Sequence, residues 1–302
     1  MSKKKIGLIG GRGFVGGEFI TLLRDHTELE LAFASSSSKA GQPITGVEQN
    51  FIALSPAQIS NHRGLDALVL ALPNGQANAW VTAVDQAKLD CCILDISADH
   101  RFDPTWVYGL PETNGPALAD AKRIANPGCY ATAAALALVP LRDILSGPPS
   151  VFGVSGYSGA GATPNPRNDP VNLADNLLAY SLSGHIHERE ISHHLGQKVH
   201  FTPHVAEFFR GILLSIHLKF AQPVSAPLIT EALQQYYQYA PLVHVVDEIP
   251  NIQQVTGTPD ARIGGVIADN SGLHGVVVVC LDNLLKGAAS QAIQNLEIAL
   301  TP

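Results

Sequence analysis

The sequence predicts a two-domain α/β protein, with a parallel sheet in its first half and a mixed, largely antiparallel sheet in its second half. Three observations support this fold class. The chain has 302 residues, and a domain holds about 150 residues on average. In the first half, apolar runs alternate with helical patterns, as in a parallel sheet covered on both faces. In the second half, apolar and polar side chains alternate along residues 212–220, which is typical of a strand in a sheet with one open face.

The individual elements follow from apolar runs and helical periodicity. The first half is expected to contain strands at 3–9, 29–34, 65–72 and 91–96, with helices at 14–24 and 76–87. An alanine-rich helix should follow Pro127-Gly128, running from Cys129 to about residue 145. The second half is expected to contain strands at 212–220, 242–246, 263–268 and 275–281, and a final helix at 284–300.

Charge and apolar patterning limit the partners. The formal net charge is −7, whereas a nucleic-acid-binding protein usually carries a basic face. The basic residues 1–5 are followed by glycines that interrupt any signal-peptide core. The longest later apolar run, 131–141, is shorter than the roughly 20 residues that span a bilayer. The four cysteines show no paired metal spacing and are too few for a disulfide scaffold. We therefore expect a cytoplasmic protein with no nucleic-acid or membrane partner.

The turn after the first strand matches two dinucleotide-binding spacings. Gly11, Gly13 and Gly16 fit G-x-G-x-x-G, and Gly10 with Gly13 and Gly16 fits G-x-x-G-x-x-G. Glycine suits this turn because the backbone must approach a pyrophosphate on the N-terminus of the next helix. A glycine-rich turn without a ligand is the alternative, but the strand–turn–helix context favours a Rossmann-type site.

The residues after the second strand indicate which cofactor is bound. An NAD site usually carries an acidic side chain there, which bonds the ribose hydroxyls. Here the position falls in a run of four serines, 35–38, followed by Lys39. Neutral hydroxyls and a nearby cation tolerate the additional phosphate of NADP, so the sequence favours NADP(H).

Cys129 is a candidate nucleophile. It lies in the first turn of the predicted alanine-rich helix, where backbone N–H groups and the helix dipole stabilise an anion. This environment increases the thiolate fraction of a cysteine. Cys91, Cys92 and Cys280 lie inside apolar strands, where a cysteine is commonly a small hydrophobic residue. The simplest use of a nucleophilic cysteine beside a nicotinamide cofactor is a thioester, formed from an acyl phosphate and reduced by hydride to an aldehyde.

Several segments resemble the N-acetyl-gamma-glutamyl-phosphate reductase family, NADP-dependent enzymes of arginine biosynthesis. Besides the glycine turn, they are residues 95–102, 108–112, 126–132, 155–161, 185–191, 201–204 and 282–288. The resemblance implies a semialdehyde dehydrogenase-like architecture. In it, 1–129 and 283–302 form the Rossmann domain, and 130–282 form the catalytic and oligomerisation domain. It also implies an acyl-phosphate or semialdehyde substrate, with phosphate as the other reactant. The open face of the sheet in the second half suggests a homodimer or homotetramer.

The resemblance further implies roles for individual residues. Cys129 would be the nucleophile and His187 the general acid/base. Arg101, Tyr180 and Glu190 would act on the substrate or phosphate side. The cofactor-binding residues would be Gly10, Gly11, Arg12, Gly13, Phe14, Val15, Gly16, Ser35, Ser36, Ser37, Asn74, Ser158, Gly159, Asn283 and Lys286.

The chain departs from the family pattern at three places. Phe14-Val15 replaces a common Tyr-Thr pair, and Arg189 stands at a usual proline position. Ala162 stands where a basic residue is common, so a substrate or phosphate contact is either lost or supplied by Arg167.

Four alternatives stay open at this point. His187, Glu190 and His194 share helical spacing, as a metal site would require, although the pattern is not H-E-x-x-H. Aspartate-semialdehyde dehydrogenases share the cysteine and Arg101 but typically lack the Gly-Cys-Tyr-Ala-Thr pattern of residues 128–132. An aminoadipate-phosphate reductase of lysine biosynthesis is closer, because it differs mainly in the substrate pocket. A non-catalytic NADP-binding regulator would not need Cys129, Arg101 and His187 together.

Overall fold

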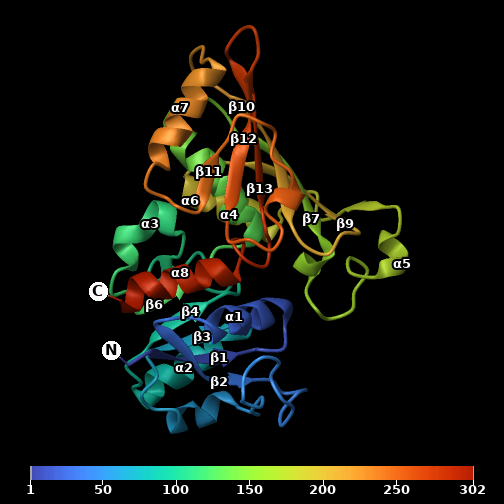
Figure 1. The fold of residues 1–302 in the computed structure, drawn as a ribbon. Coiled ribbons are helices and arrows are strands. Elements are labelled where there is room, and N and C mark those ends of the chain that lie inside the picture. The colour runs from blue at the N-terminus through green and yellow to red at the C-terminus, as the bar shows by residue number, and fades with distance from the viewer. Residues whose placement is uncertain (1, 302) are drawn as a thin grey trace. The chain divides into compact units, whose positions relative to one another are not determined.

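The computed structural model describes residues 2–301, and the chain forms two compact units (Figure 1). The first unit ends at Pro127 and resumes at Ala288, so the last helix of the chain belongs to it. The second unit is Gly128–Gly287. This arrangement confirms the two-part α/β fold class.

The first unit contains a six-stranded parallel sheet in the order β2-β1-β3-β4-β6-β5. Every neighbouring pair is parallel, as the alternation of strands and helices predicts. The strands are β1 (Lys4–Ile9), β2 (Leu29–Ser35), β3 (Ala67–Leu70), β4 (Cys92–Asp95), β5 (Val107–Tyr108) and β6 (Arg123–Ala125).

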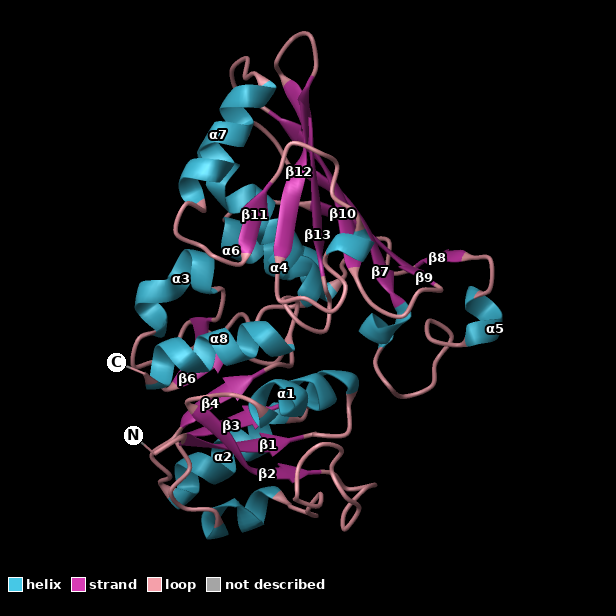
Figure 2. Cartoon of the chain, viewed as in Figure 1, coloured by secondary structure: helices cyan, strands magenta, loops and turns pink. Residues whose placement is uncertain are grey.

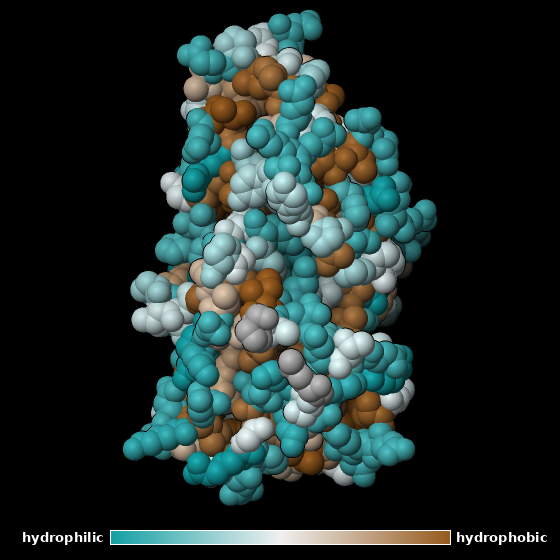
Figure 3. All heavy atoms as spheres, turned by 60° about the vertical axis from the view of Figure 1, so that its left-hand side comes forward, coloured by the Kyte–Doolittle hydropathy of each residue, from teal (hydrophilic) through white to brown (hydrophobic). Residues whose placement is uncertain are grey.

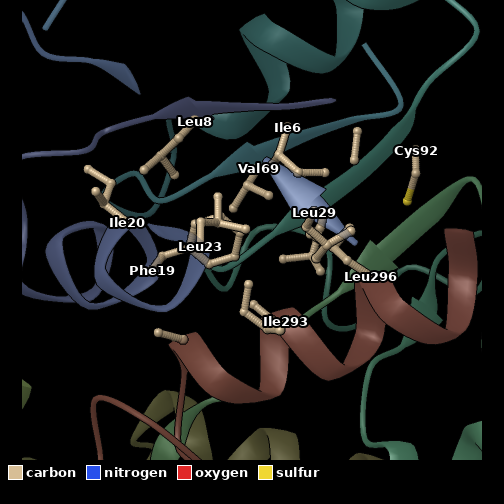
Figure 4. Packing of buried hydrophobic residues seen from close by; sticks show 14 of the residues in the cluster. Ile6, Leu8, Phe19, Ile20, Leu23, Leu29, Val69, Cys92, Ile293 and Leu296 are labelled. Atoms are coloured by element: carbon tan, nitrogen blue, oxygen red, sulfur yellow. The ribbon is translucent and has the colours of Figure 1, made fainter. Parts of the chain in front are cut away.

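Two hydrophobic clusters fix helices to the two faces of this sheet. α1 (Phe14–Arg24) and α8 (Ala289–Leu300) cover one face. Figure 4 shows Phe19 and Leu23 of α1 and Ile293 of α8 packed against strand residues. The 3₁₀ helix η1 (Pro56–Asn61) and α2 (Ala77–Ala87) cover the other face. Each fully buried aliphatic side chain contributes about 1.5–3 kcal/mol, so the first and last helices are held to the sheet by the same core.

Two predicted helices have different bounds in the structure. The final helix begins at Ala289, not at 284, because Asp282 Oδ1 accepts the N–H groups of Leu284 and Leu285 and closes residues 282–287 as a turn. The alanine-rich helix α4 (Cys129–Leu138) ends before residue 145, and the 3₁₀ helix η2 (Val139–Ile144) follows it. Pro140 lacks an N–H group, which interrupts the α-helical hydrogen bonds.

The second unit contains a seven-stranded mixed sheet in the order β11-β12-β13-β10-β7-β9-β8. Neighbours are antiparallel except for β7 with β9 and β11 with β12. The strands, drawn in magenta in Figure 2, are β7 (Ser150–Gly156), β8 (Leu177–Ala179), β9 (His200–Ala206), β10 (Ile212–Lys219), β11 (Val243–Val245), β12 (Ala261–Ala268) and β13 (His274–Leu281).

Helices cover one face of the mixed sheet. α4 packs against β10 and β13, α7 (Ala226–Tyr236) packs against β12, and α6 (Ile186–Leu195) packs against α4. The alternation along β10 is confirmed: Ile212, Leu214 and Ile216 are buried, whereas the intervening side chains are partly or fully exposed.

The remaining helices are short. They are α3 (Pro111–Leu118) in the first unit, and η3 (Tyr157–Ala160), α5 (Pro170–Leu173) and η4 (Ile252–Gln254) in the second. Hydrophilic side chains cover most of the face shown in Figure 3, and hydrophobic patches interrupt it.

Candidate active site

The strand order of the first unit places a ligand crevice at the glycine turn. β1 has β2 on one side and β3 on the other, so the connections from β1 and β2 run in opposite directions. In open parallel sheets, ligands bind at the carboxyl ends of strands where the order reverses in this way. The turn at Gly10–Gly16 follows β1, and Asn74 follows β3. Both predicted cofactor segments therefore lie at this switch point.

The glycines of the turn have different steric requirements. Gly10 has φ +89°, and a Cβ there would lie 2.1 Å from the Ala71 carbonyl oxygen. A Cβ on Gly16 would lie 2.6 Å from the Gly10 oxygen, so both positions require glycine for packing. At Gly13 the nearest atom is 3.7 Å away. The protein itself leaves space at Gly13, where α1 begins without a side-chain cap, and this suits a phosphate on the helix N-terminus.

Other predicted cofactor residues of the first unit are partly engaged in local structure. Ser35 and Ser36 are buried, and Ser36 Oγ accepts the N–H of Lys39 at 3.2 Å. Ser37 is exposed. Asn74 Oδ1 accepts the Ala98 N–H at 3.0 Å. Arg12 is exposed, whereas Phe14 and Val15 are half-buried, and Val15 packs against the core beneath the turn. The turn after β2 therefore presents hydroxyls and Lys39 but no carboxylate.

Arg101 is buried at the carboxyl edge of the same sheet. Its Nε donates to the Asn126 carbonyl at 2.9 Å, and its Nη2 donates to the Ile96 carbonyl at 2.8 Å. The preceding His100 bonds Asp95 at 2.7 Å and stacks on Trp106. These contacts hold the guanidinium in a fixed place within the first unit.

Cys129 is the first residue of α4 in the second unit. Gly128 is the N-cap, and as a glycine it has no side chain with which to cap the helix. The backbone N–H of Gly128 donates instead to Glu190 Oε1 at 2.8 Å. Gly287 lies directly against Cys129, since a Cβ there would be 2.7 Å from Cys129 Cβ. The helix start therefore presents N–H groups and a positive dipole end to the thiol, as the sequence predicts.

Aromatic and histidine rings form a cluster beside Cys129. The ring of Tyr130 lies 5.8 Å from that of His187 and 4.9 Å from that of Phe201, between centroids. His185 lies 4.9 Å from His187 and 5.5 Å from Tyr180. His185 is also the N-cap of α6, since its Nδ1 accepts the N–H of His187 at 3.1 Å. The cluster brings the predicted His187 and Tyr180 together around the residue that follows Cys129.

Burial and charge shift the pKa values of three members of this cluster. Burial, with the nearby Cys129 charge, raises the pKa of Tyr180 to about 12. Burial raises the pKa of Tyr130 well above its usual value. Burial and the Arg167 cation lower the pKa of His185. Burial therefore disfavours the phenolate form of both tyrosines, and the Tyr130 hydroxyl donates to the His204 carbonyl at 2.7 Å. The guanidinium of Arg167 lies 4.9 Å from the centroid of the Tyr180 ring, and its charge lowers the pKa of Tyr180, which partly opposes the effect of burial.

The last predicted cofactor residues form a buried network in the second unit. Asn283 Oδ1 accepts the Gly211 N–H at 2.7 Å, and its Nδ2 donates to Ser158 Oγ at 2.9 Å. Asp282 is held by Arg210, whose Nε and Nη2 donate to the two carboxylate oxygens at 2.6 and 3.1 Å. This network fixes the turn that carries Gly287.

Two further predicted residues lie in or beside that network. Lys286 is fully buried in the same turn. Gly159 follows Ser158, and a Cβ there would lie 3.0 Å from Ser155 Oγ.

Several residues of the site were not singled out by the sequence. Asp282 and Gly287 lie in the segment 282–288 that carries the family resemblance, but they were given no role of their own. Arg210 lies outside all of those segments, because its contact with Asp282 joins parts of the chain that are far apart. Tyr130 and His185 could have been found from their positions beside Cys129 and His187. Within residues 2–301 no three His, Cys, Asp or Glu side chains gather as a metal site requires. No helix in that range combines the length and apolar character needed to cross a bilayer.

Two family models cover most of the chain. Residues 5–121 match the semialdehyde dehydrogenase NAD binding domain, and residues 129–283 match the semialdehyde dehydrogenase dimerisation domain. The chain therefore belongs to the semialdehyde dehydrogenase family. The parallel sheet with its glycine turn and the cysteine at the start of a helix are consistent with this class of protein.

Within this family, the chain is similar to proteins named N-acetyl-gamma-glutamyl-phosphate reductase. It is 47% identical to the protein of Xanthomonas campestris pv. campestris over 300 residues, which cover 98% of this chain and 95% of that one. It is 48% identical to the protein of Stenotrophomonas maltophilia with the same coverage. The resemblance of the sequence segments is thus confirmed. The fold is also that of aspartate semialdehyde dehydrogenase II from Vibrio cholerae, with a TM-score of 0.82, 18% identity and full coverage of both chains.

Proposed function

We propose that this protein reduces N-acetyl-gamma-glutamyl phosphate to N-acetylglutamate 5-semialdehyde, using NADPH and releasing phosphate. The observation that carries the proposal is the placement of Cys129 as the first residue of α4, beside the ring cluster of Tyr130, His187 and Tyr180. The names of relatives sharing 46–48% identity over nearly the whole chain support the same substrate.

In this mechanism Cys129 forms and loses one covalent bond. His187 takes the thiol proton, and the thiolate attacks the acyl carbon. The bond from that carbon to the phosphate oxygen breaks, phosphate leaves, and a thioester remains on Cys129. NADPH bound at the glycine turn would supply the hydride that reduces the thioester. His187 returns its proton as the carbon–sulfur bond breaks, so the products are an aldehyde and a free thiol. The N–H groups at the start of α4 stabilise negative charge at both steps.

The first unit supplies the cofactor site in this proposal. The open position at Gly13 and the uncapped N-terminus of α1 would hold the pyrophosphate. The hydroxyls of Ser35–Ser37 and the cation of Lys39 would accept the NADP phosphate, which a carboxylate would repel. Asn74 lies at the same edge of the sheet.

In the second unit, Ser158, Gly159, Asn283 and Lys286 are assigned to the cofactor by the resemblance. We propose that residues 1–129 and 283–302 form the cofactor domain, and that residues 130–282 form the catalytic and oligomerisation domain.

The substrate side of the site draws on three residues. Tyr180 has a protonated hydroxyl, whose ionisation burial disfavours further, and it donates a hydrogen bond to the acyl group or its carboxylate. Arg101 supplies the cation for the leaving phosphate. Glu190 contributes through the backbone of Gly128. We place the enzyme in the cytoplasm, where a reduced Cys129 would be maintained.

The enzyme is proposed to work as a homodimer or homotetramer. The second unit matches a domain described as a dimerisation domain. Its sheet presents a face opposite the helices on which Phe152 is 40% exposed, beside the register partners Ser215 and Thr202. A second copy of this chain would cover that face.

The experiment that tests the function measures NADPH formation by the purified protein. N-acetylglutamate semialdehyde plus phosphate is the test substrate, and aspartate semialdehyde and an aminoadipate-type semialdehyde are the parallel arms. Phosphate-dependent activity with the N-acetylated aldehyde alone supports the proposal. Activity confined to another aldehyde would support the proposed cysteine chemistry and contradict the proposed substrate.

A cysteine variant separates an enzyme from a cofactor-binding regulator. Cys129→Ser should abolish turnover and leave NADPH binding, followed by fluorescence titration, unchanged. Folded protein that binds NADPH but is silent with all three aldehydes would contradict the enzymatic proposal.

A further inference from the structure

Glu190 is a buried carboxylate that links the two helices of the candidate active site. It lies on α6 three residues after His187, and its side chain is fully buried. Its Oε1 accepts a hydrogen bond from the backbone N–H of Gly128 at 2.8 Å, across 62 positions of sequence. Gly128 immediately precedes Cys129. One side chain therefore joins the helix of His187 to the peptide in front of the nucleophile.

The peptide that Glu190 holds has few other constraints. Gly128 has no side chain to fix it, and glycine has more backbone freedom than any other residue. Its carbonyl accepts the Thr132 N–H at 2.8 Å, which is the first hydrogen bond of α4. The bond to Glu190 fixes the opposite side of the residue. Together the two bonds set the extended conformation of Gly128, with φ −71° and ψ 151°, from which α4 begins.

The residue type at position 190 is unusual for a buried helix face. Burying a carboxylate is costly unless hydrogen bonds replace its water, and an apolar side chain would fill the same space without that cost. Residues three apart share one face of a helix, so Glu190 and His187 project from α6 on the same side. The buried carboxylate of Glu190 accepts a hydrogen bond from Gly128, which an apolar side chain could not do.

We propose that Glu190 is a positioning residue. Its hydrogen bond to Gly128 fixes the start of α4 against α6 and so sets the place of the Cys129 thiol relative to the His187 imidazole. The inference rests on the proposed function, because the placement matters only if these two groups react with substrate. This role requires a side chain long enough to bring an acceptor oxygen to the Gly128 N–H, and it does not require a negative charge. A misplacement of about 1 Å between reacting groups can cost roughly 100-fold in rate.

Three substitutions at Glu190 separate the effect of the length of the side chain from the effect of its charge. Glu190→Gln keeps an oxygen at the same reach and removes the charge. Glu190→Asp keeps the charge and withdraws it by one methylene group. Glu190→Ala removes both. We expect Gln to retain kcat within a few-fold, and Asp and Ala to lower kcat by roughly 10- to 100-fold with little change in KM for the aldehyde. Glu231→Gln, an exposed change on α7, is the matched control and should behave as the unmodified protein.

A second readout does not depend on the reaction. Backbone hydrogen exchange of peptides covering residues 126–132, followed by mass spectrometry, reports the bond to Gly128 directly. Protection should fall in the Asp and Ala variants and persist in the Gln variant. If the unmodified protein is inactive with every aldehyde, the proposed function fails, and this exchange pattern still decides whether Glu190 holds the helix start.

Three results would overturn the inference. The first is an Asp variant that retains activity while the Gln variant loses it, which would show that Glu190 acts through its negative charge. The second is a raised KM with unchanged kcat, which would make Glu190 a direct substrate ligand. The third is unchanged exchange in all three variants.

Discussion

Gly287 lies so close to Cys129 that a methyl group on Gly287 would stand 2.7 Å from Cys129 Cβ and 2.7 Å from the Asn283 carbonyl oxygen. The turn that carries Gly287 is itself held by the paired Arg210 and Asp282. Glu190 therefore holds the peptide of Gly128, which precedes the nucleophile, and the turn that carries Gly287 packs against Cys129 itself.

Gly287→Ala tests that contact. The added methyl group cannot fit without moving Cys129 or the Asn283 backbone, so we expect a loss of about 1–3 kcal/mol in the free energy of unfolding, as for other overpacked sites. We also expect a drop in kcat and a changed rate of Cys129 alkylation. Gly115→Ala, where a Cβ meets no atom within 4 Å, is the control for thermal unfolding. An unaltered alkylation rate in Gly287→Ala would show that the thiol is not set by this turn.

Gly10→Ala should affect the stability of the fold, whereas Gly13→Ala should affect the binding of the cofactor. Gly10 has φ +89° and no room for a Cβ, and such a backbone costs about 1–2 kcal/mol for an L-residue before the overlap with Ala71 is counted. Gly13 has room within the protein. We expect Gly10→Ala to lower the midpoint of thermal unfolding, and Gly13→Ala to keep that midpoint while weakening NADPH binding. Equal cofactor affinity in Gly13→Ala and the unmodified protein would place the pyrophosphate elsewhere.

The cap of α6 should make stability depend on pH. The pKa of His185 is lowered from 6.5 by burial and by Arg167, so the folded state favours the neutral ring, which accepts the His187 N–H. The unfolded chain takes up the proton first as pH falls. This contribution is therefore complete above about pH 6.5 and is lost progressively below it. Urea unfolding between pH 7 and pH 5 should show the decline.

Substitutions at His185 isolate that contribution. His185→Asn keeps an N-cap acceptor that does not titrate, and it should flatten the decline. His185→Ala should cost about 1 kcal/mol at pH 7 through loss of the cap. His193→Asn, at the other end of α6, serves as the control and should preserve the decline. A pH dependence that persists in His185→Asn would assign it to another group.

Phe152→Asp should dissociate the proposed homodimer. Phe152 packs against His204, with 4.3 Å between the ring centroids and 39° between the ring planes, and it is 40% exposed on the sheet face opposite the helices. A second copy that covers this face would have to bury a carboxylate in place of an apolar ring, which is costly. Sedimentation velocity should show a shift to the mass of one chain. Val171→Asp, at a side chain that is 84% exposed, should not change the mass. A Phe152→Asp protein that keeps its assembled mass would move the interface to another surface.

Local patterns predicted the elements that carry the cofactor turn and the nucleophile. Apolar runs located the strands that became β1–β4, and periodicity gave α1 with the bounds observed, 14–24. The position of Cys129 at a helix start follows from the Pro-Gly break and the alanine-rich run after it. The predictions were weaker at helix ends. The Asp282 side chain accepts the N–H groups of Leu284 and Leu285 and delays the start of α8. Pro140 ends α4, so these contacts and the geometry of proline overrode the apolar pattern.

The sequence by itself determined the fold class, the glycine turn at a parallel-sheet edge and a cysteine at a helix N-terminus, because each depends on residues near one another in the chain. Only the tertiary structure decided that Glu190 bonds Gly128, that Arg210 pairs with Asp282 and that Gly287 packs against Cys129. These pairs are separated by 62, 72 and 158 positions. No spacing rule relates such residues, because their proximity is produced by the packing of α4, α6 and the mixed sheet.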